Sequence, residues 1–401
     1  MKKHMRCTLS ALMGISSLVV PLAAFSAGVV ATPNSGASVS QLPGGVEVIN
    51  IATPDQNGLS HNQYTAFNVS ESGVVVNNSY TGGPSSLTGS SIAGNANLAG
   101  GSASVILNEV VSPTASHLNG AIELLGQDAK LIIANPNGIA CNGCSFNNIS
   151  QATLVAGESR MSQGALEGFA ISGEIKVGHK GLEASDTSAL TLAANQLLID
   201  GIVTGQNVAA LAGNGFLSAD AVSLTQGESA MKRNVAIDVA ALGGIRGNNI
   251  RIMSTDNHVG VGVNVDGDIM ANNSLNIDAY GNVVVDGFVH SGGDQVLHAN
   301  NLNNSGMIKS DGTMKVVTTQ DINNNHGKIL STNDMSMDVH HLNNDYGHIA
   351  TAGDLTLDNR AWFFGPTNFW GSIETGGKVK GDRPGWILGF GGSLKEDTAA
   401  L

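Results

Sequence analysis

Apolar and polar residues alternate with a period of two along much of the chain, in short runs. Examples are Val46–Ile49, Ala189–Leu192 and Leu355–Leu357, and glycine, asparagine and proline separate such runs. Because successive side chains of a strand point to opposite faces, this pattern predicts many short strands that each bury one face. An apolar period of about 3.6 is not sustained anywhere after residue 26. We therefore expect an all-β protein.

The stretch Leu131–Phe146 shows how the predicted strands are connected. An apolar run leads into Asn135-Pro136-Asn137-Gly138, Ile139 follows, and Cys141-Asn142-Gly143-Cys144 forms a second turn sequence before Phe146. Proline fixes φ near about −65° and Asn-Gly tolerates positive φ, so both sequences favour sharp turns. A chain that turns every few residues between short strands is expected to build a sheet that coils.

Related sequences recur beyond residue 300. Leu302-Asn303-Asn304, Ile322-Asn323-Asn324 and Leu342-Asn343-Asn344 precede Gly306, Gly327 and Gly347, which are 21 and 20 residues apart. A fixed period of this size is typical of solenoids, in which stacked coils bury surface that one repeat cannot bury alone. We expect turn asparagines to form side-chain ladders between neighbouring coils.

Composition agrees with an all-β fold and argues against nucleic acid as a partner. The chain has 52 glycines, only 4% aromatic residues and only 13% charged residues, which is poor material for amphipathic helices. Its 19 basic and 32 acidic residues give a net charge of −13. Proteins that bind nucleic acid need a basic stripe, so no nucleic acid is expected as a partner.

The first residues predict export. Lys2, Lys3 and Arg6 precede a mostly apolar run, Leu9–Phe25, which ends in small residues. This is the pattern of a secretory signal peptide, here residues 1–26, and it is favoured over a membrane anchor because Pro21 and several serines interrupt a run of modest length. No later segment approaches the length of an apolar span, so we expect no transmembrane segment in the mature chain, which would pass through the periplasm.

Two cysteines remain after the signal peptide, Cys141 and Cys144. A Cys-x-x-Cys sequence serves as a redox pair, as half of a zinc site, or as a small disulfide. The redox interpretation needs a helix start and the zinc interpretation needs a second pair of ligands, and the sequence offers neither. We expect a structural disulfide between Cys141 and Cys144.

Signatures of catalysis are missing from the sequence, which contains no His-Glu-x-x-His, Gly-x-Ser-x-Gly or P-loop motif. The eleven histidines are scattered except for His340-His341, whose side chains should point to opposite faces of a strand. Asp266-Gly267-Asp268 is too short a signal for a calcium site. We expect no enzyme activity, no cofactor and no metal site.

Five short motifs occur in order along the first part of the chain. They are Gly58–Asn62, Phe67–Val69, Val76–Ser79, Ile106–Val110 and Ile133–Ile139. Together they resemble the amino-terminal secretion domain of filamentous haemagglutinins and related two-partner-secretion (TPS) exoproteins, over about residues 30–260. One turn departs from the family pattern: many haemagglutinin-type members have a second Asn-Pro-Asn-Leu where this chain has Asn95-Ala96-Asn97-Leu98.

The resemblance implies a right-handed parallel β-helix with extra short strands or hairpins in its amino-terminal domain. It also implies secretion across the Gram-negative outer membrane by a TpsB-type barrel transporter with periplasmic POTRA domains. The transporter-recognition candidates are Asn135, Pro136, Asn137, Gly138 and Ile139, and the secondary turn motif consists of Asn95, Asn97 and Leu98. On the residues alone, Asx hydrogen bonds that cap the turn are the simpler role of Asn135 and Asn137, and both roles can coexist.

These patterns divide the chain into four parts. They are a signal peptide (1–26), a TPS secretion domain (27–265), haemagglutinin-type β-helix repeats of about 20 residues (266–360) and an aromatic-rich carboxy-terminal cap or tail (361–401). All three tryptophans, Trp362, Trp370 and Trp386, lie in the last part. They would cover the open final coil, or form a surface that binds a sugar or a partner.

The leading functional prediction is a secreted or cell-surface adhesin or haemagglutinin that contacts host cells or neighbouring bacteria and contributes to virulence. The main alternative is a haemolysin, cytolysin or contact-dependent-inhibition exoprotein, including a truncated front end of one, because the cysteine pair is similar to that of those branches. A β-helix polysaccharide-active enzyme is a distant third, and would need acidic and basic residues together along one groove.

Overall fold

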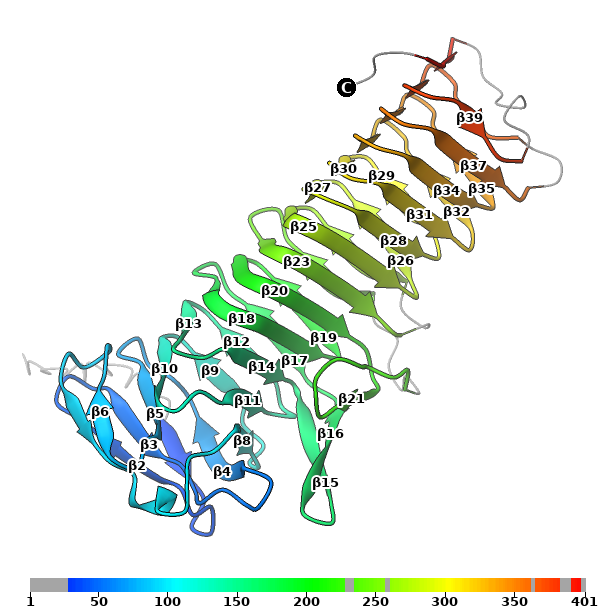
Figure 1. Ribbon diagram of the computed structural model, residues 1–401. Helices are drawn as coiled ribbons and strands as arrows, with labels where there is room; N and C mark the ends of the chain where they lie inside the picture. Colours follow the sequence, from blue (N-terminus) through cyan, green and yellow to red (C-terminus); the bar gives the residue numbers. More distant parts are fainter. Residues whose placement is uncertain (1–27, 228–233, 257–259, 362–364, 383–390, 398–401) are drawn as a thin grey trace, which may run out of the picture.

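The chain forms an elongated parallel β-solenoid, as the sequence predicted (Figure 1). The computed structural model describes residues 28–227, 234–256, 260–361, 365–382 and 391–397. Within these ranges there is no α-helix, and the single short helix is the 3-10 turn η1 (Ala96–Leu98). The predicted signal peptide lies outside the described residues.

Three ladders of parallel strands run along the solenoid. Ladder one contains β4 (Leu59–Phe67), β8 (Val105–Val110), β11 (Lys130–Ala134), β14 (Gln151–Val155), β28 (Gln295–Ala299), β31 (Met314–Thr318), β34 (Met335–Val339), β37 (Leu355–Asn359) and β39 (Val379–Lys380). Ladder two contains β3 (Glu47–Asn50), β5 (Val74–Asn78), β10 (Ala121–Gly126), β13 (Cys144–Asn147), β27 (Phe288–Ser291), β30 (Met307–Ser310), β33 (Lys328–Ser331), β36 (His348–Thr351), β38 (Ser372–Thr375) and β40 (Ser393–Lys395).

Ladder three contains β9 (Ser116–Leu118), β12 (Ile139–Cys141), β17 (Glu174–Val177), β19 (Gln196–Ile199), β22 (Val235–Val239), β24 (Val261–Val265), β26 (Asn282–Val285), β29 (Leu302–Asn304), β32 (Asp321–Asn323) and β35 (His341–Asn343). Four long strands cross from ladder two into ladder one: β18 (Leu182–Ala194), β20 (Ile202–Ala212), β23 (Gly244–Ser254) and β25 (Asp268–Ala279). Register shifts inside β18 and β23, for example between Ala184 and Ala189, lie where the strand passes from one ladder to the other.

The core lies inside the solenoid because the inward-facing residues of each ladder are apolar and stack on one another. In ladder three, one buried column joins seven successive coils through Leu197, Ile237, Val263, Val283, Leu302, Ile322 and Leu342. This column is the structural result of the period-two alternation, and it buries each coil against the next.

Extra antiparallel strands lie outside the ladders in the amino-terminal part, as predicted. β1 (Val29–Ala31) pairs with β4, β2 (Ser38–Gln41) pairs with β3, and β6 (Gly82–Pro84) pairs with β7 (Ser91–Ala93). β15 (Gly157–Ser162), β16 (Ala165–Ile171) and β21 (Phe216–Ser218) form a separate three-stranded sheet. The β15–β16 hairpin projects from the solenoid in Figure 1.

The carboxy-terminal repeats use buried polar ladders at their corners. Asn304 donates to Asn324 (Nδ2 to Oδ1, 2.6 Å), Asn324 donates to Asn344 (2.7 Å), and Asn344 donates to Asn368 (2.7 Å). The ladder begins where Val285 of β26 is followed by Asn304 of β29 in the same register. The predicted asparagine ladders are therefore present, and this one starts at Asn304.

Within the segment predicted to cap or trail the solenoid, β38, β39 and β40 extend ladders one and two. Trp370 lies at a coil corner with 64% of its surface exposed. The preceding corners place His326 and Tyr346 in a stack with ring centroids 5.1 Å apart. Trp362 and Trp386 lie outside the described residues, so a cap built from them stays a prediction.

Candidate functional site

Asn135 and Asn137 fix the turn between β11 and β12. The side-chain oxygen of the buried Asn135 accepts from the backbone N–H of Asn137 at 2.9 Å, which is an Asx turn. The amide of Asn135 donates to Ser116 Oγ and to the carbonyl of Thr114, and the amide of Asn137 donates to the carbonyl of Ser112. Both asparagines therefore attach the turn to the loop of the preceding coil.

Gly138 completes this turn with φ +106°, a conformation that residues with a Cβ rarely adopt. A Cβ at this position would also lie 3.0 Å from the backbone oxygen of Glu174 in the next coil. Ile139 follows as a buried residue of β12. Hydrogen bonds thus join the turn to the preceding coil, and the backbone of the following coil lies close to Gly138.

The secondary turn motif, which has no proline, also contains an Asx hydrogen bond and two asparagine amides that donate to a backbone carbonyl. Asn95 accepts from the N–H of Asn97 at 3.1 Å and donates to the carbonyl of Ile51, and the amide of Asn97 also reaches that carbonyl at 2.9 Å. Leu98 is buried in the main core. Ala96 in place of proline therefore leaves the turn intact, because the two asparagines carry its contacts.

A groove of about 420 Å³ brings three of the sequence motifs together with the projecting hairpin. Its lining residues are His61 and Gln63 from β4, Glu109 and Val110 from the end of β8, Val111 directly after it, Pro136 from the turn, and Glu158, Ser159, Arg160 and Met161 from β15. Val111 and Met161 are 51% and 39% exposed. We name this feature the hairpin groove. The Asn95–Leu98 turn and the cysteine pair do not line it.

Glu109 is the buried centre of the hairpin groove. One of its oxygens lies 2.8 Å from Nε2 of His61 and also accepts from Gln63, and the other accepts from the Ser159 N–H at 3.1 Å and the Ser159 hydroxyl at 2.6 Å. Burial alone would raise the pKa of Glu109, but the hydrogen bonds from His61 and Ser159 outweigh burial and lower that pKa. The ionised carboxylate thus holds β15 against the solenoid.

This arrangement does not activate a nucleophile. The Ser159 hydroxyl donates to the carboxylate and His61 contacts the other carboxylate oxygen, so the imidazole is not placed to take the serine proton. Within the described ranges no three His, Cys, Asp or Glu residues gather as a metal site. His340 instead lies 3.3 Å from the carboxylate of Asp321 in the preceding coil.

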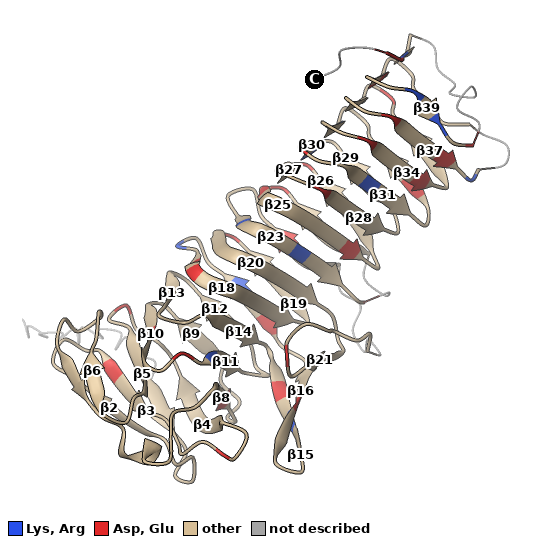
Figure 2. Cartoon of the chain, viewed as in Figure 1, with Lys and Arg blue, Asp and Glu red and all other residues tan. Residues whose placement is uncertain are grey.

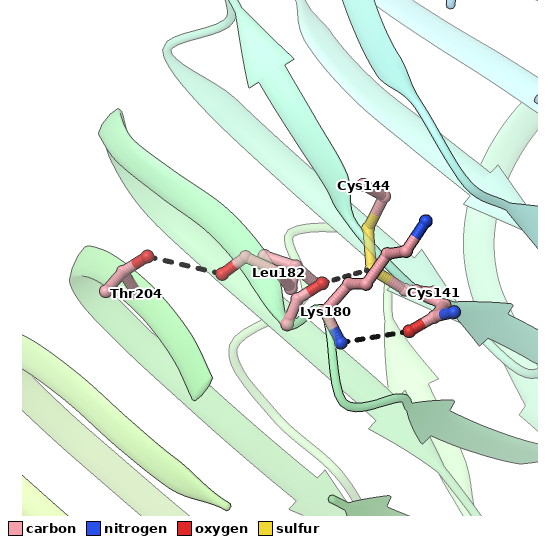
Figure 3. The surroundings of a disulfide bond; sticks show 7 residues. Cys141, Cys144, Lys180, Leu182 and Thr204 are labelled. Atoms are coloured by element: carbon pink, nitrogen blue, oxygen red, sulfur yellow. Dashed lines mark hydrogen bonds between the residues drawn. A yellow bond between two sulfur atoms is a disulfide. The ribbon is translucent and has the colours of Figure 1, made fainter. Parts of the chain in front are cut away.

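The cysteine pair lies at the next corner of the same coil (Figure 3). Cys141 ends β12, Cys144 begins β13, and a disulfide joins them while both are buried. Gly143 turns the corner with φ +91°, and Asn142 accepts from the N–H of Lys180 at 3.0 Å. The disulfide is therefore part of the turn structure between two ladders.

Pro136 was predicted from the sequence as a transporter-recognition residue, whereas His61, Glu109 and Ser159 were given no role. His61 and Glu109 lie inside two of the ordered motifs, and their polar character at strand positions was a weak signal. The contributions of Ser159, Arg160 and Met161 had no signal, since β15 reads Gly-Glu-Ser-Arg-Met-Ser, without a motif or a regular alternation. Figure 2 shows lysines and arginines spread over separate coils without a continuous basic stripe in this view.

The fold class is a parallel β-solenoid whose first coils carry external hairpins. The profile of the TPS secretion domain matches residues 27–285. The chain belongs to the family of TPS-domain exoproteins, which are secreted by two-partner secretion and are found outside the cell or at its surface.

Relatives in this family are much longer than the region they share with this chain. The tRNA nuclease CdiA of Yersinia mollaretii is 37% identical over 287 residues, which are 71% of this chain and 9% of that protein. The Hemolysin of Proteus mirabilis is 37% identical over 269 residues, 66% of this chain and 16% of that protein. The chain thus spans less than a fifth of the length of either relative.

A solved structure shares the fold. The crystal structure of the filamentous hemagglutinin secretion domain superposes with a TM-score of 0.55 at 24% identity, over 92% of this chain and 99% of that one. No helix in the described part of the chain is long and apolar enough to cross a membrane.

Proposed function

We propose that this chain is the secretion part of a contact-dependent-inhibition or haemolysin-type exoprotein, and that it docks on its TpsB-type transporter through the hairpin groove. The convergence of His61, Glu109 and Pro136 on one groove carries the proposal. The relatives more than 30% identical include CdiA toxins and a hemolysin, which favours this class over an adhesin. Neighbouring bacterial or host cells would be the targets after export.

The groove has the features of a transient protein-binding surface. Exposed apolar side chains, Val111 and Met161, lie beside the charged pair Glu158 and Arg160, whose side chains are 3.1 Å apart. Apolar anchors supply affinity when a partner buries them, and a charged rim orients the partner. The expected partner is the periplasmic POTRA region of the transporter.

Folding of the chain outside the cell would make export effectively one-way. Each new coil buries its apolar column against the coil before it, so folding at the surface disfavours return of the chain. This step needs no nucleotide and no metal. The Asn135–Gly138 turn would act in it as a corner that joins three successive coils.

The docking proposal is tested with the purified chain and the isolated POTRA region of a TpsB-type transporter that secretes it. A Val111→Asp, Met161→Asp double variant should weaken binding by about tenfold or more, because it charges the apolar anchors. Leu242→Asp is the matched control, since Leu242 is 80% exposed and lies outside the groove. Equal loss in both variants, or no loss in the double variant, would overturn the assignment of the groove.

A further inference from the structure

Two external elements cover apolar surface on the outside of the solenoid. Flap one is residues 82–93 with β6 and β7, and its Ile92 packs in a cluster with Val48, Val75 and Leu125 of ladder two. Flap two is the sheet of β15, β16 and β21, and its Phe169 and Leu217 pack in a cluster with outward-facing residues of ladder one. Those ladder residues are Leu107, Ile132, Ala134, Val155, Ala193 and Leu211.

One buried glutamate of the solenoid binds each flap, and in flap one the amide of Asn77 also donates to the carbonyl of Ala93. Glu109 of β8 accepts from the N–H and hydroxyl of Ser159 in flap two. Glu123 of β10 accepts from the hydroxyls of Ser85 and Ser86 and from the N–H groups of Ser86 and Leu87, at 2.5–3.2 Å. Both glutamates are only 5% exposed. The same chemistry therefore attaches two unrelated hairpins.

Protonation conflicts with both arrangements. An ionised carboxylate only accepts hydrogen bonds, whereas a protonated one carries an O–H donor. On the flap side, the backbone N–H groups of Ser86, Leu87 and Ser159 can only donate, so a proton on the carboxylate oxygen that faces one of them would break a buried contact. The main core is apolar, and Asp256 is the one other buried acidic residue in the described ranges.

We propose that Glu109 and Glu123 are acid-sensitive latches, so that acidification releases the two flaps and exposes the apolar strips beneath them while the solenoid coils stay folded.

The two latches should open in a fixed order. Glu109 faces His61 at 2.8 Å, with Arg160 and Glu158 lining the same groove. A protonated His61 attracts the ionised form of Glu109 and keeps it charged to lower pH. Glu123 contacts serine hydroxyls and backbone N–H groups, and among the described residues it is the only charged one that lines its cavity, which includes Asn147 and Asn148. Flap one therefore opens first as the pH falls.

Opening of flap two would also remove one wall of the hairpin groove. An effect of this opening on transporter docking rests on the proposed function, whereas the release of the flaps by acid does not. The latch is tested without any transporter, so its failure and the failure of transporter docking are distinguishable.

The test is hydrogen–deuterium exchange of the purified chain from about pH 7 down to about pH 3, corrected for intrinsic rates. Residues 82–93 should lose protection by about tenfold or more first, residues 157–171 should follow at lower pH, and ladder segments such as 295–318 should stay protected. Flaps that stay protected until the ladders unfold, or flap two opening first, would overturn the proposal.

Variants make the assignment specific. Glu123→Gln should open flap one and Glu109→Gln should open flap two already near neutral pH, because a glutamine amide presents a donor as the protonated acid does. Glu167→Gln is the matched control, since Glu167 is an exposed residue of β16 in flap two. Wild-type protection of both flaps in the two latch variants would contradict the latch.

Discussion

His61 and Glu109 are 48 positions apart in the chain, yet Nε2 of His61 lies 2.8 Å from Oε2 of Glu109. The contact exists because β4 and β8 pair in parallel with His61 beside Leu107, two residues before Glu109. Pro136 reaches the same groove from the next coil. Stacking of coils thus converts three separate motifs into one surface, on which the functional proposal rests.

Stability should fall in acid because of the two buried glutamates. Burial raises and hydrogen bonds lower the pKa of each, with the net result that both pKa values lie below the ordinary value. A lowered pKa in the folded state stabilises the fold above the unfolded pKa, about 4.3 for glutamate, and this stabilisation is lost as the pH falls through the folded pKa.

The measurement is the free energy of unfolding of the amino-terminal part between about pH 7 and about pH 3. A Glu109→Gln, Glu123→Gln double variant should be less stable than the wild type at neutral pH and lose less stability in acid. A wild type and a variant with parallel pH profiles would show that these carboxylates do not control acid stability.

Breaking the buried asparagine ladder should destabilise the repeats. Asn324→Ala removes the acceptor of Asn304 and the donor to Asn344, which leaves two buried amides short of a partner and costs about 2–4 kcal/mol. Asn325 is the adjacent exposed asparagine, and Asn325→Ala should change stability by less than about 0.5 kcal/mol. Hydrogen exchange over residues 302–349 measures both, and similar losses in the two variants would refute the ladder's contribution.

One buried polar side chain should be replaceable with a gain in stability. Gln295 is 1% exposed, occupies the core column between Leu275 and Met314, and has no hydrogen-bond partner for either amide atom among the described residues. Gln295→Leu should stabilise the local coils by about 1–3 kcal/mol, because it replaces a buried amide that has no hydrogen-bond partner with an apolar side chain.

Gln320→Leu is the control for this exchange, since Gln320 is exposed on a neighbouring coil. The local opening free energy from hydrogen exchange of residues 288–318 reports the effect. A destabilised Gln295→Leu variant would mean that the amide is held by a hydrogen bond that stabilises the coil more than apolar packing of the leucine does.

The Asn135–Gly138 turn should affect export more than docking. Gly138→Val places a branched side chain at φ +106° and against the backbone of Glu174, so the corner strains and the coils stack more slowly. Secretion should slow while POTRA binding is retained. Gly100→Val is the control, because a Cβ at Gly100 meets nothing within 4 Å. Lost POTRA binding in Gly138→Val would instead indicate that the turn itself is a contact.

Much of the fold was predictable because solenoids repeat a local pattern. The period-two alternation marks ladder strands, and Asn304, Asn324 and Asn344 mark successive corners. The flaps were not predictable in this way, because β6 and β15 lack a regular alternation of apolar and polar residues, and the alternation at the end of β16 continues into a ladder strand. Ile171–Val177 illustrates the problem: it is one alternating run in the sequence, but β16 of flap two ends at Ile171 and β17 of ladder three begins at Glu174.

The candidate site was predictable only in its parts. The turn geometry at Asn135–Gly138 follows from local chemistry, and so does the equivalent turn at Asn95–Leu98. The hairpin groove depends on which residues of different coils lie side by side, and that register is set by long-range stacking. Without knowledge of that register, Ser159 could not be linked to Glu109, which lies 50 residues away in the sequence.

The most direct test of the account is export itself. The chain is produced in a Gram-negative host with and without a TpsB-type barrel transporter, and the protein in the medium, at the cell surface and in the periplasm is quantified. The chain should leave the cell only when the transporter is present, and should collect in the periplasm and be degraded there when the transporter is missing. Equal amounts outside the cell in both strains would contradict this prediction.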